Sequence, residues 1–171
     1  MVHGAGGASA HREGIVQITR DGNIASARTG KLWLAATGLH AIDDDPWREY
    51  LGQAAASVKS EGPFHGVLFW TPKHGPSTSQ RRMLTHEFAK AIALDAQRRV
   101  ALISDSALVR GTITAIAWFT RSDVATFAPN EAKRALDWLA EDVAFDRTQA
   151  QHALDEIIGA VQVPLRQTRT G

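Results

Sequence analysis

The sequence predicts an α/β fold: a central mixed, largely parallel sheet of four to five strands with helices packed on it. From residue 32 onward, segments of strand length alternate with segments of helical periodicity. Residues 66–71 (GVLFWT) and 100–104 (VALIS) are short apolar runs, which is typical of parallel strands that are covered on both faces. Such alternation is the pattern of β-α-β units in a layered α/β domain.

The composition excludes several classes of protein. The 171 residues are 44% hydrophobic and 22% charged, with a net charge of +1. Proteins that bind nucleic acid or anionic membranes usually concentrate positive charge, so neither partner is expected. No apolar run approaches the roughly 20 residues of a membrane span. The absence of cysteine excludes disulfides and thiolate sites and agrees with a cytoplasmic location.

One domain is expected, at residues 14–163. Residues 1–13 are rich in Gly, Ala, Ser and His, lack the apolar core of a signal peptide, and are interpreted as a disordered leader. Residues 164–171 are interpreted as a flexible tail.

The first half of the chain reads as strand, strand, helix, strand. A weak strand at residues 15–19 precedes Asp21-Gly22, a pair suited to a tight turn, and a stronger strand covers residues 31–36. A helix then begins with Asp45 as its cap and Pro46 in its first position. Gly62-Pro63 ends it. Its apolar face is expected to contain Trp47, Tyr50, Leu51, Ala54 and Val58.

The second half continues the alternation after the strand at residues 66–71. A helix starts within residues 76–80, a strand follows at 100–104, and an apolar helix covers 105–119. A short strand at 123–127 and two amphipathic helices, at 128–143 and 146–161, complete the order. Thr148 and Gln151 stand at capping-box spacing. The expected inward stripes are Leu84, Phe88, Ala91 and Ile92; Ala132, Ala135, Leu136, Leu139 and Val143; and Leu154, Ile157, Ile158 and Val161.

Motifs for nucleotide, nucleophile and metal chemistry are missing. Lys73 precedes the loop glycine Gly75, which is the wrong order for a P-loop, and neither GxGxxG nor GxSxG occurs. His86-Glu87 lacks the second histidine of a zinc helix, because position 90 is Lys. The acidic run at residues 43–45 is explained by helix capping, with a hard cation as the alternative. We therefore expect no catalytic residues, no metal and no cofactor.

Two junctions between a strand and a helix carry the candidate site residues. In the first, at residues 71–80, Ser77 and Gln80 have the spacing of a capping box. The alternative is an anion or phosphorylation site, because hydroxyls at a helix start stand beside cations. Its candidate acceptors and charges are Ser77, Thr78, Ser79, Lys73, Arg81 and Arg82.

The second junction, at residues 104–106, is a candidate contact at the start of the following helix. Ser104 or Asp105 can cap that helix. The alternative is an anion or ligand contact, in which Ser106 and Arg110 would also take part.

Residues 98–139, from RRVALISDSA to RALDWL, resemble the STAS superfamily, in particular bacterial proteins similar to anti-sigma-factor antagonists (SpoIIAA-like). The similarity lies in a buried strand, a helix opened by small residues, a strand ending in TFAP and an amphipathic helix. Upstream, KLWLAATG at residues 31–38 is similar to the early strand of the family, and residues 66–71 to its central strand. The resemblance covers residues 31–142.

The resemblance implies a place for a regulated hydroxyl. In STAS antagonists the phosphorylated serine lies in a D-S-S/T-G turn after the central strand, and by chain order this position corresponds to residues 71–80. Here no aspartate precedes Ser77, Thr78 or Ser79. We therefore expect the fold to persist with an altered or lost switch, and not the usual kinase partner.

The resemblance leads to a non-enzymatic regulatory or scaffold protein that binds a protein partner, with a homodimer as one candidate. Phosphorylation in residues 71–80 is the expected form of regulation. One alternative is a domain that binds a small ligand, lipid or nucleotide, because the STAS layout is similar to domains with an apolar pocket under a helix. An enzyme with an unrecognised site is the remaining alternative.

Overall fold

A six-stranded sheet is the centre of the computed structural model, which describes residues 15–91, 98–106 and 122–162. The strand order follows the chain from β1 to β6. Strands β1, β2 and β3 pair antiparallel, whereas β3, β4, β5 and β6 pair parallel. The predicted α/β class with a mixed, largely parallel sheet is confirmed, but the sheet has six strands instead of four to five.

The elements occur in the expected alternation. The strands are β1 (Gln17–Ile18), β2 (Ile24–Thr29), β3 (Leu32–Thr37), β4 (Gly66–Trp70), β5 (Arg98–Ile103) and β6 (Ser122–Phe127). The helices are α1 (Asp44–Glu61), α2 (Thr78–Ala91), α4 (Ala132–Leu139), which follows the 3-10 turn η1 (Pro129–Glu131), and α5 (Arg147–Gln162). The expected leader, the expected tail and residues 107–119 of the expected apolar helix lie outside the described residues.

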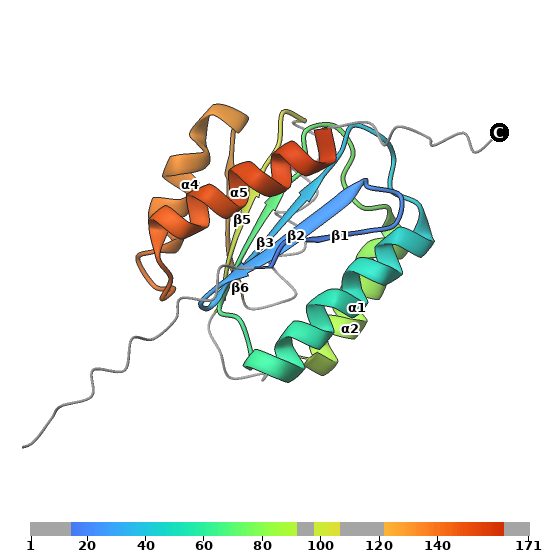
Figure 1. Ribbon diagram of the computed structural model, residues 1–171, viewed down its shortest axis with the longest axis horizontal. Helices are drawn as coiled ribbons and strands as arrows, with labels where there is room; N and C mark the ends of the chain where they lie inside the picture. Colours follow the sequence, from blue (N-terminus) through green and yellow to red (C-terminus); the bar gives the residue numbers. More distant parts are fainter. Residues whose placement is uncertain (1–14, 92–97, 107–121, 163–171) are drawn as a thin grey trace, which may run out of the picture.

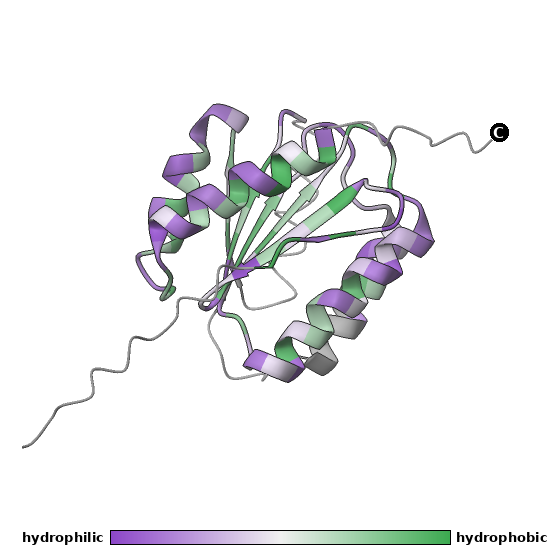
Figure 2. Ribbon diagram, viewed as in Figure 1, coloured by the Kyte–Doolittle hydropathy of each residue, from purple (hydrophilic) through white to green (hydrophobic). Residues whose placement is uncertain are grey.

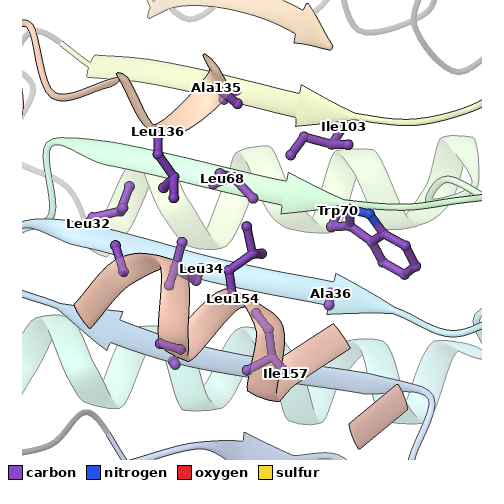
Figure 3. Close-up of a cluster of buried hydrophobic side chains, with 14 of the residues drawn as sticks. Leu32, Leu34, Ala36, Leu68, Trp70, Ile103, Ala135, Leu136, Leu154 and Ile157 are labelled. Atoms are coloured by element: carbon purple, nitrogen blue, oxygen red, sulfur yellow. The ribbon is translucent and has the colours of Figure 1, made fainter. Parts of the chain in front are cut away.

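Helices cover both faces of the sheet (Figure 1). Strand β3 shows why two cores form, because successive side chains of a strand point to opposite faces. Leu32 and Leu34 contribute to the core under α4 and α5, part of which Figure 3 shows. Trp33 and Ala35 contribute to the core under α1. The strands are accordingly apolar while the helices present polar residues outward (Figure 2).

Strand β2 is not among the predicted strands. Its sequence, IASART, shows only a weak alternation of apolar and polar residues and no continuous apolar run, so no strand was assigned to it. All six of its residues are buried, because β2 lies between β1 and β3 and is covered on both faces. The second arm of the hairpin around Asp21-Gly22 is therefore a central strand of the sheet.

Two predicted helix starts are wrong. The N-cap of α1 is Asp43, so Asp45 lies in the first turn and Pro46 is the third helical residue. In α5 the Asp146 side chain caps the helix by accepting from the Gln149 backbone N–H at 2.8 Å. Asp146 lies nearer the helix start than Thr148 and meets the same need for an acceptor. The end of α1 is as predicted, with Gly62 at φ 79° donating to the Val58 carbonyl at 2.9 Å.

Arg28 of β2 closes the C-terminal end of α1. Its guanidinium is almost fully buried and lies 4.0 Å from the Glu61 carboxylate. Burial lowers the pKa of Arg28, and the nearby Glu61 opposes that shift. The last carbonyls of a helix lack intrahelical donors, and a cation there also interacts favourably with the helix dipole. The oxygens that accept from Arg28 are those of Gly30, Ser57, Glu61, Gly62 and Pro63.

Replacing Arg28 tests whether its hydrogen bonds to the end of α1 stabilise the fold. We expect Arg28→Met to lower the free energy of unfolding by about 2–4 kcal/mol, because it removes the guanidinium donors from one buried and several part-buried carbonyls. Arg28→Lys keeps the charge but not the planar fork, so its loss should be smaller. The measurement is the urea midpoint at unchanged m-value. Arg134→Met, at an exposed arginine of α4, is the control. Equal midpoints for Arg28→Met and this control would contradict the role given to Arg28.

Candidate functional site

The two candidate junctions lie at the same edge of the sheet. Strands β3 to β6 run parallel, so their carboxyl ends meet at one edge, which is where ligands and partners gather in α/β sheets. The Thr71 backbone N–H donates to the Ile103 carbonyl at 2.9 Å, and the Ser104 N–H donates to the Phe127 carbonyl at 3.1 Å. Residues 71–80 and 104–106 therefore start from neighbouring positions.

Ser77 and Gln80 form the predicted capping box. The Ser77 backbone N–H donates to Gln80 Oε1 at 2.9 Å, and the Gln80 backbone N–H donates to Ser77 Oγ at 3.2 Å. Ser77 therefore immediately precedes α2, which begins at Thr78. The hydroxyls of Ser77 and Ser79 are also 2.9 Å apart. The prediction that Ser77 and Gln80 form a capping box is therefore confirmed.

Gln80 does more than close the capping box. Its side chain is 2% exposed, and Nε2 donates to the Ile42 carbonyl at 2.7 Å and to Asp44 Oδ1 at 3.0 Å. Its backbone carbonyl accepts from Trp47 Nε1 at 3.0 Å. A single buried residue thus joins the start of α2 to the start of α1. The sequence contains no signal for this link, because the partners are more than 30 residues apart.

An aromatic cluster holds the start of α1 on the sheet. The rings of Trp47 and Tyr50 are 5.2 Å apart, and each lies within 6.3 Å of the Phe69 ring of β4. Trp33 Nε1 donates to the Tyr50 hydroxyl at 3.2 Å, and burial raises the pKa of Tyr50. Aromatic rings bury a large apolar area and gain from edge-to-face contacts, so this cluster stabilises the helix start to which Gln80 binds.

The three candidate hydroxyls are exposed but have different neighbours. Thr78 Oγ1 accepts from Arg81 Nη2 at 2.9 Å, and Arg81 Nη1 donates to the Pro76 carbonyl at 3.3 Å. Lys73 and Arg82 are exposed cations on either side of them. The first turn of α2 contains no acidic residue, so its own side chains do not compensate the positive end of the helix dipole. The Asp44 carboxylate contacts the side chain of Gln80, one residue beyond these hydroxyls.

The second junction is arranged differently. Ser104 is buried, and its Oγ accepts from the Ser106 backbone N–H at 3.1 Å, a local turn that places Asp105 at the surface. Arg110 lies outside the described residues, as does the helix that Ser104 or Asp105 was expected to cap. The structure therefore brings Ser104 and Ser106 together and leaves the anion or ligand alternative at this junction as a prediction.

Buried hydroxyls end three neighbouring strands. Thr37, Thr71 and Ser104 directly follow or end β3, β4 and β5, in line with the register that aligns Ala36, Trp70 and Ile103. Thr71 Oγ1 donates to the His74 carbonyl at 2.7 Å and so shapes the loop. Thr37 Oγ1 makes no hydrogen bond with any described residue.

Metal and membrane functions find no support in the described residues. Within residues 15–91, 98–106 and 122–162, no three side chains of His, Asp or Glu gather closely enough to hold a metal ion. His74 and His86 are exposed, as expected of a loop residue and a helix surface residue. No helix in these ranges has both the length and the apolar character needed to cross a membrane.

Comparison with known proteins points to one family. The family model described as SpoIIAA-like matches residues 39–140, which is more than half of the chain. The matched range begins just after β3 and ends just after α4, so it contains both candidate junctions, whereas β1, β2, β3 and α5 lie outside it. Neither a curated protein nor a solved structure matches the chain.

The structural role of the capping box can be separated from any other role of the loop. Ser77→Ala removes the acceptor for the Gln80 N–H and should lower the free energy of unfolding by about 1 kcal/mol. Ser77→Asn keeps a side-chain acceptor and should restore most of that loss. Thr78→Ala, one residue further on, is the matched control and should change stability by less than about 0.5 kcal/mol. Urea unfolding measures all three, and equal effects of Ser77→Ala and Thr78→Ala would contradict the capping role.

Proposed function

Because the chain belongs to the SpoIIAA-like family of STAS-like proteins, we propose that it is a cytoplasmic regulatory protein that binds a protein partner and catalyses no reaction. The family match supports the regulatory, protein-binding role. The proposed contact surface is the start of α2 with the loop before it, residues 71–82. It presents three hydroxyls and three cations, and the Thr78 hydroxyl accepts from the Arg81 guanidinium.

The observation that carries this proposal is the exposure of Ser77, Thr78 and Ser79 at the positive end of a 14-residue helix. The first backbone N–H groups of a helix have no intrahelical carbonyl as acceptor. That of Gln80 donates to Ser77 Oγ, and those of Thr78 and Ser79 would be available to a negative group brought by a partner or by modification. A phosphoryl group carries close to two negative charges at neutral pH and would find helix amides and arginine together here.

Of the three hydroxyls, Thr78 has the surroundings that stabilise a phosphoryl group best. Its Oγ1 already contacts the Arg81 guanidinium, and phosphate oxygens would convert that contact into a charge-assisted hydrogen bond. Lys73 and Arg82 are exposed near the same helix start. In the proposed regulation, the unmodified loop binds the partner, and a phosphoryl group is held by these cations and reverses the charge that the partner meets.

The test compares the loop with an equivalent helix start on the opposite face of the sheet. Residues 77–79 are replaced together by Ala and separately by Asp, and each tagged full-length variant is used to recover partners from the cell of origin. We expect the Asp variant to recover about tenfold less of the partner that wild type recovers, because the added negative charges disturb the electrostatic complementarity of the interface by about 1.4 kcal/mol. The Ala variant should recover nearly as much as wild type.

Thr148→Asp is the matched control, since Thr148 is an exposed hydroxyl residue in the first turn of α5. Quantitative mass spectrometry of the recovered proteins gives the ratios, and gel filtration of the purified chain shows whether the partner is a second copy. Recovery that is the same for wild type and both loop variants would remove residues 77–79 from the contact surface.

A further inference from the structure

Strand β6 forms one edge of the sheet, and half of its backbone groups face away from the sheet. It pairs with β5 alone, whereas the opposite edge is the two-residue strand β1. The Ser104 N–H donates to the Phe127 carbonyl, so the backbone groups of Phe127 face β5. These groups alternate in direction along a strand, and those of Val124 and Thr126 therefore face outward. Among the residues that the structure describes, none forms a hydrogen bond with these outward groups.

The usual protections of an edge strand are missing from β6 itself. An open strand edge invites pairing with another chain, and proteins guard such edges with Lys, Pro, a bulge or a very short strand. The sequence of β6, SDVATF, has six residues and neither Lys nor Pro. Its register with β5 runs without a bulge from Ser122 to Phe127. A strand this regular is a template for one further strand.

We propose that β6 pairs antiparallel with β6 of a second copy of this chain, so that two sheets join into one across a two-fold axis. A two-fold dimer uses the same surface on both copies, and an antiparallel pair forms its hydrogen bonds between residues whose backbone groups face each other. Val124 and Thr126 of one copy then exchange N–H···O=C bonds with Thr126 and Val124 of the other, and Ala125 faces its counterpart at the axis. This surface is separate from residues 71–82, so the inference goes beyond the proposed function and does not rest on it.

The charge of Asp123 selects this register. A two-fold axis at Val124 would also align outward-facing groups, but the two Asp123 carboxylates would then lie on one face only two residues apart along the strands, about 7 Å. With the axis at Ala125 they are four residues apart, about 14 Å, which exceeds the Debye length of about 8 Å at physiological ionic strength. Within its own copy, Asp123 is paired in register with Arg99 of β5, and the two charges attract each other.

Helix α4 extends the interface beyond the strands. It packs on β5 and β6, on the same face of the sheet as α5 (Figure 1). The two-fold axis places the two copies of α4 two to three strand spacings apart, about 10–14 Å. A helix with its side chains is about 10–12 Å across, so the two helices meet side by side. Their outer residues include cations and an anion, Lys133, Arg134 and Asp137, so the surfaces that meet carry both signs of charge.

The strand pairing is tested at Thr126 in the full-length protein. Thr126 is exposed and its N–H faces away from β5, so Thr126→Pro removes an outward donor and no bond to β5. We expect sedimentation equilibrium to show a wild-type dimer at micromolar concentration and a dissociation constant at least tenfold higher for Thr126→Pro. Thr126→Lys keeps the N–H but adds a cation to the edge of each copy, and should have the same effect.

Thr126→Val is the matched control, because it keeps the N–H and the strand propensity and should remain dimeric. The urea midpoint of each variant verifies that it is folded. A monomeric wild type would overturn the proposal, and so would a dimer that persists in both Thr126→Pro and Thr126→Lys.

A single introduced cysteine tests the register, since the chain has no cysteine of its own. Residues that face each other at a non-hydrogen-bonded position have Cα atoms about 4.5 Å apart, which is within the range of a disulfide. With diamide as the oxidant, Ala125→Cys should cross-link two copies at least fivefold faster than Val124→Cys, whose thiols lie two residues apart along the strands. Faster cross-linking of Val124→Cys would overturn the register, and no cross-link in either variant would overturn the pairing.

The dimer and the contact surface of the preceding section can be tested separately. The Asp variant of residues 77–79 should remain dimeric, because that loop follows β4, and β5 lies between β4 and β6. Dissociation of the dimer in this variant would overturn the pairing through β6. If the loop variants leave partner recovery unchanged while Thr126→Pro dissociates the dimer, the contact surface at residues 71–82 is refuted and the strand pairing is retained.

Discussion

Burial of both faces of the parallel strands is the constraint on which the rest of this structure depends. A parallel sheet needs crossover connections, and the crossovers place helices on its faces. In strand β3 all six residues are buried: Leu32, Leu34 and Ala36 lie in the core under α4 and α5, and Trp33 and Ala35 in the core under α1. Each crossover returns the chain in the same direction, so the loops after β3, β4 and β5 must all emerge at one edge. The position of the candidate site follows from the way the core is covered.

At that edge of the sheet, the shape of the loop after β4 is determined by the free-energy cost of burying the side-chain amide of Gln80. Gln80 is almost completely buried, and a buried polar side chain is stable only when its donors and acceptors are satisfied. Satisfying them requires Ser77 on one side and Ile42 with Asp44 on the other. The helix start is thereby held in a single position, and the neighbouring hydroxyls of Thr78 and Ser79 remain at the surface. The polar network specifies the conformation, and the aromatic cluster beneath it provides the stability.

The sequence predicts those features that depend on near neighbours. The capping box of Ser77 and Gln80 spans three residues, and the end of α1 at Gly62 depends on the conformation of one residue, so local patterns were sufficient. The apolar runs at β4 and β5 were recognised for the same reason. Strand β2 could not be found in this way, because Arg28 is tolerated in the interior only through the end of α1, about 30 residues further along.

The same limit applies to the candidate site. The spacing of Ser77 and Gln80 indicates a cap and says nothing of Ile42, which is 38 residues away and is reached only when α1 and α2 pack on the same face. In the sequence, Thr148 was as good a capping residue as Ser77, and the structure prefers Asp146. Several residues near a helix start can satisfy the same donors, and the choice depends on where the preceding loop enters.

The electrostatic surroundings separate hydroxyls that look equivalent in the sequence STS. The α2 dipole favours negative charge at all three positions, so it cannot distinguish them. The groups that contact each hydroxyl do distinguish them: Thr78 Oγ1 accepts from the Arg81 guanidinium, whereas Ser77 Oγ accepts from the backbone N–H of Gln80. A negative charge added at Thr78 would therefore stand beside a cation, whereas one added at Ser77 would stand beside a helix backbone N–H. The difference follows from the place of each residue at the helix start, because Ser77 precedes α2 and Thr78 is its first residue.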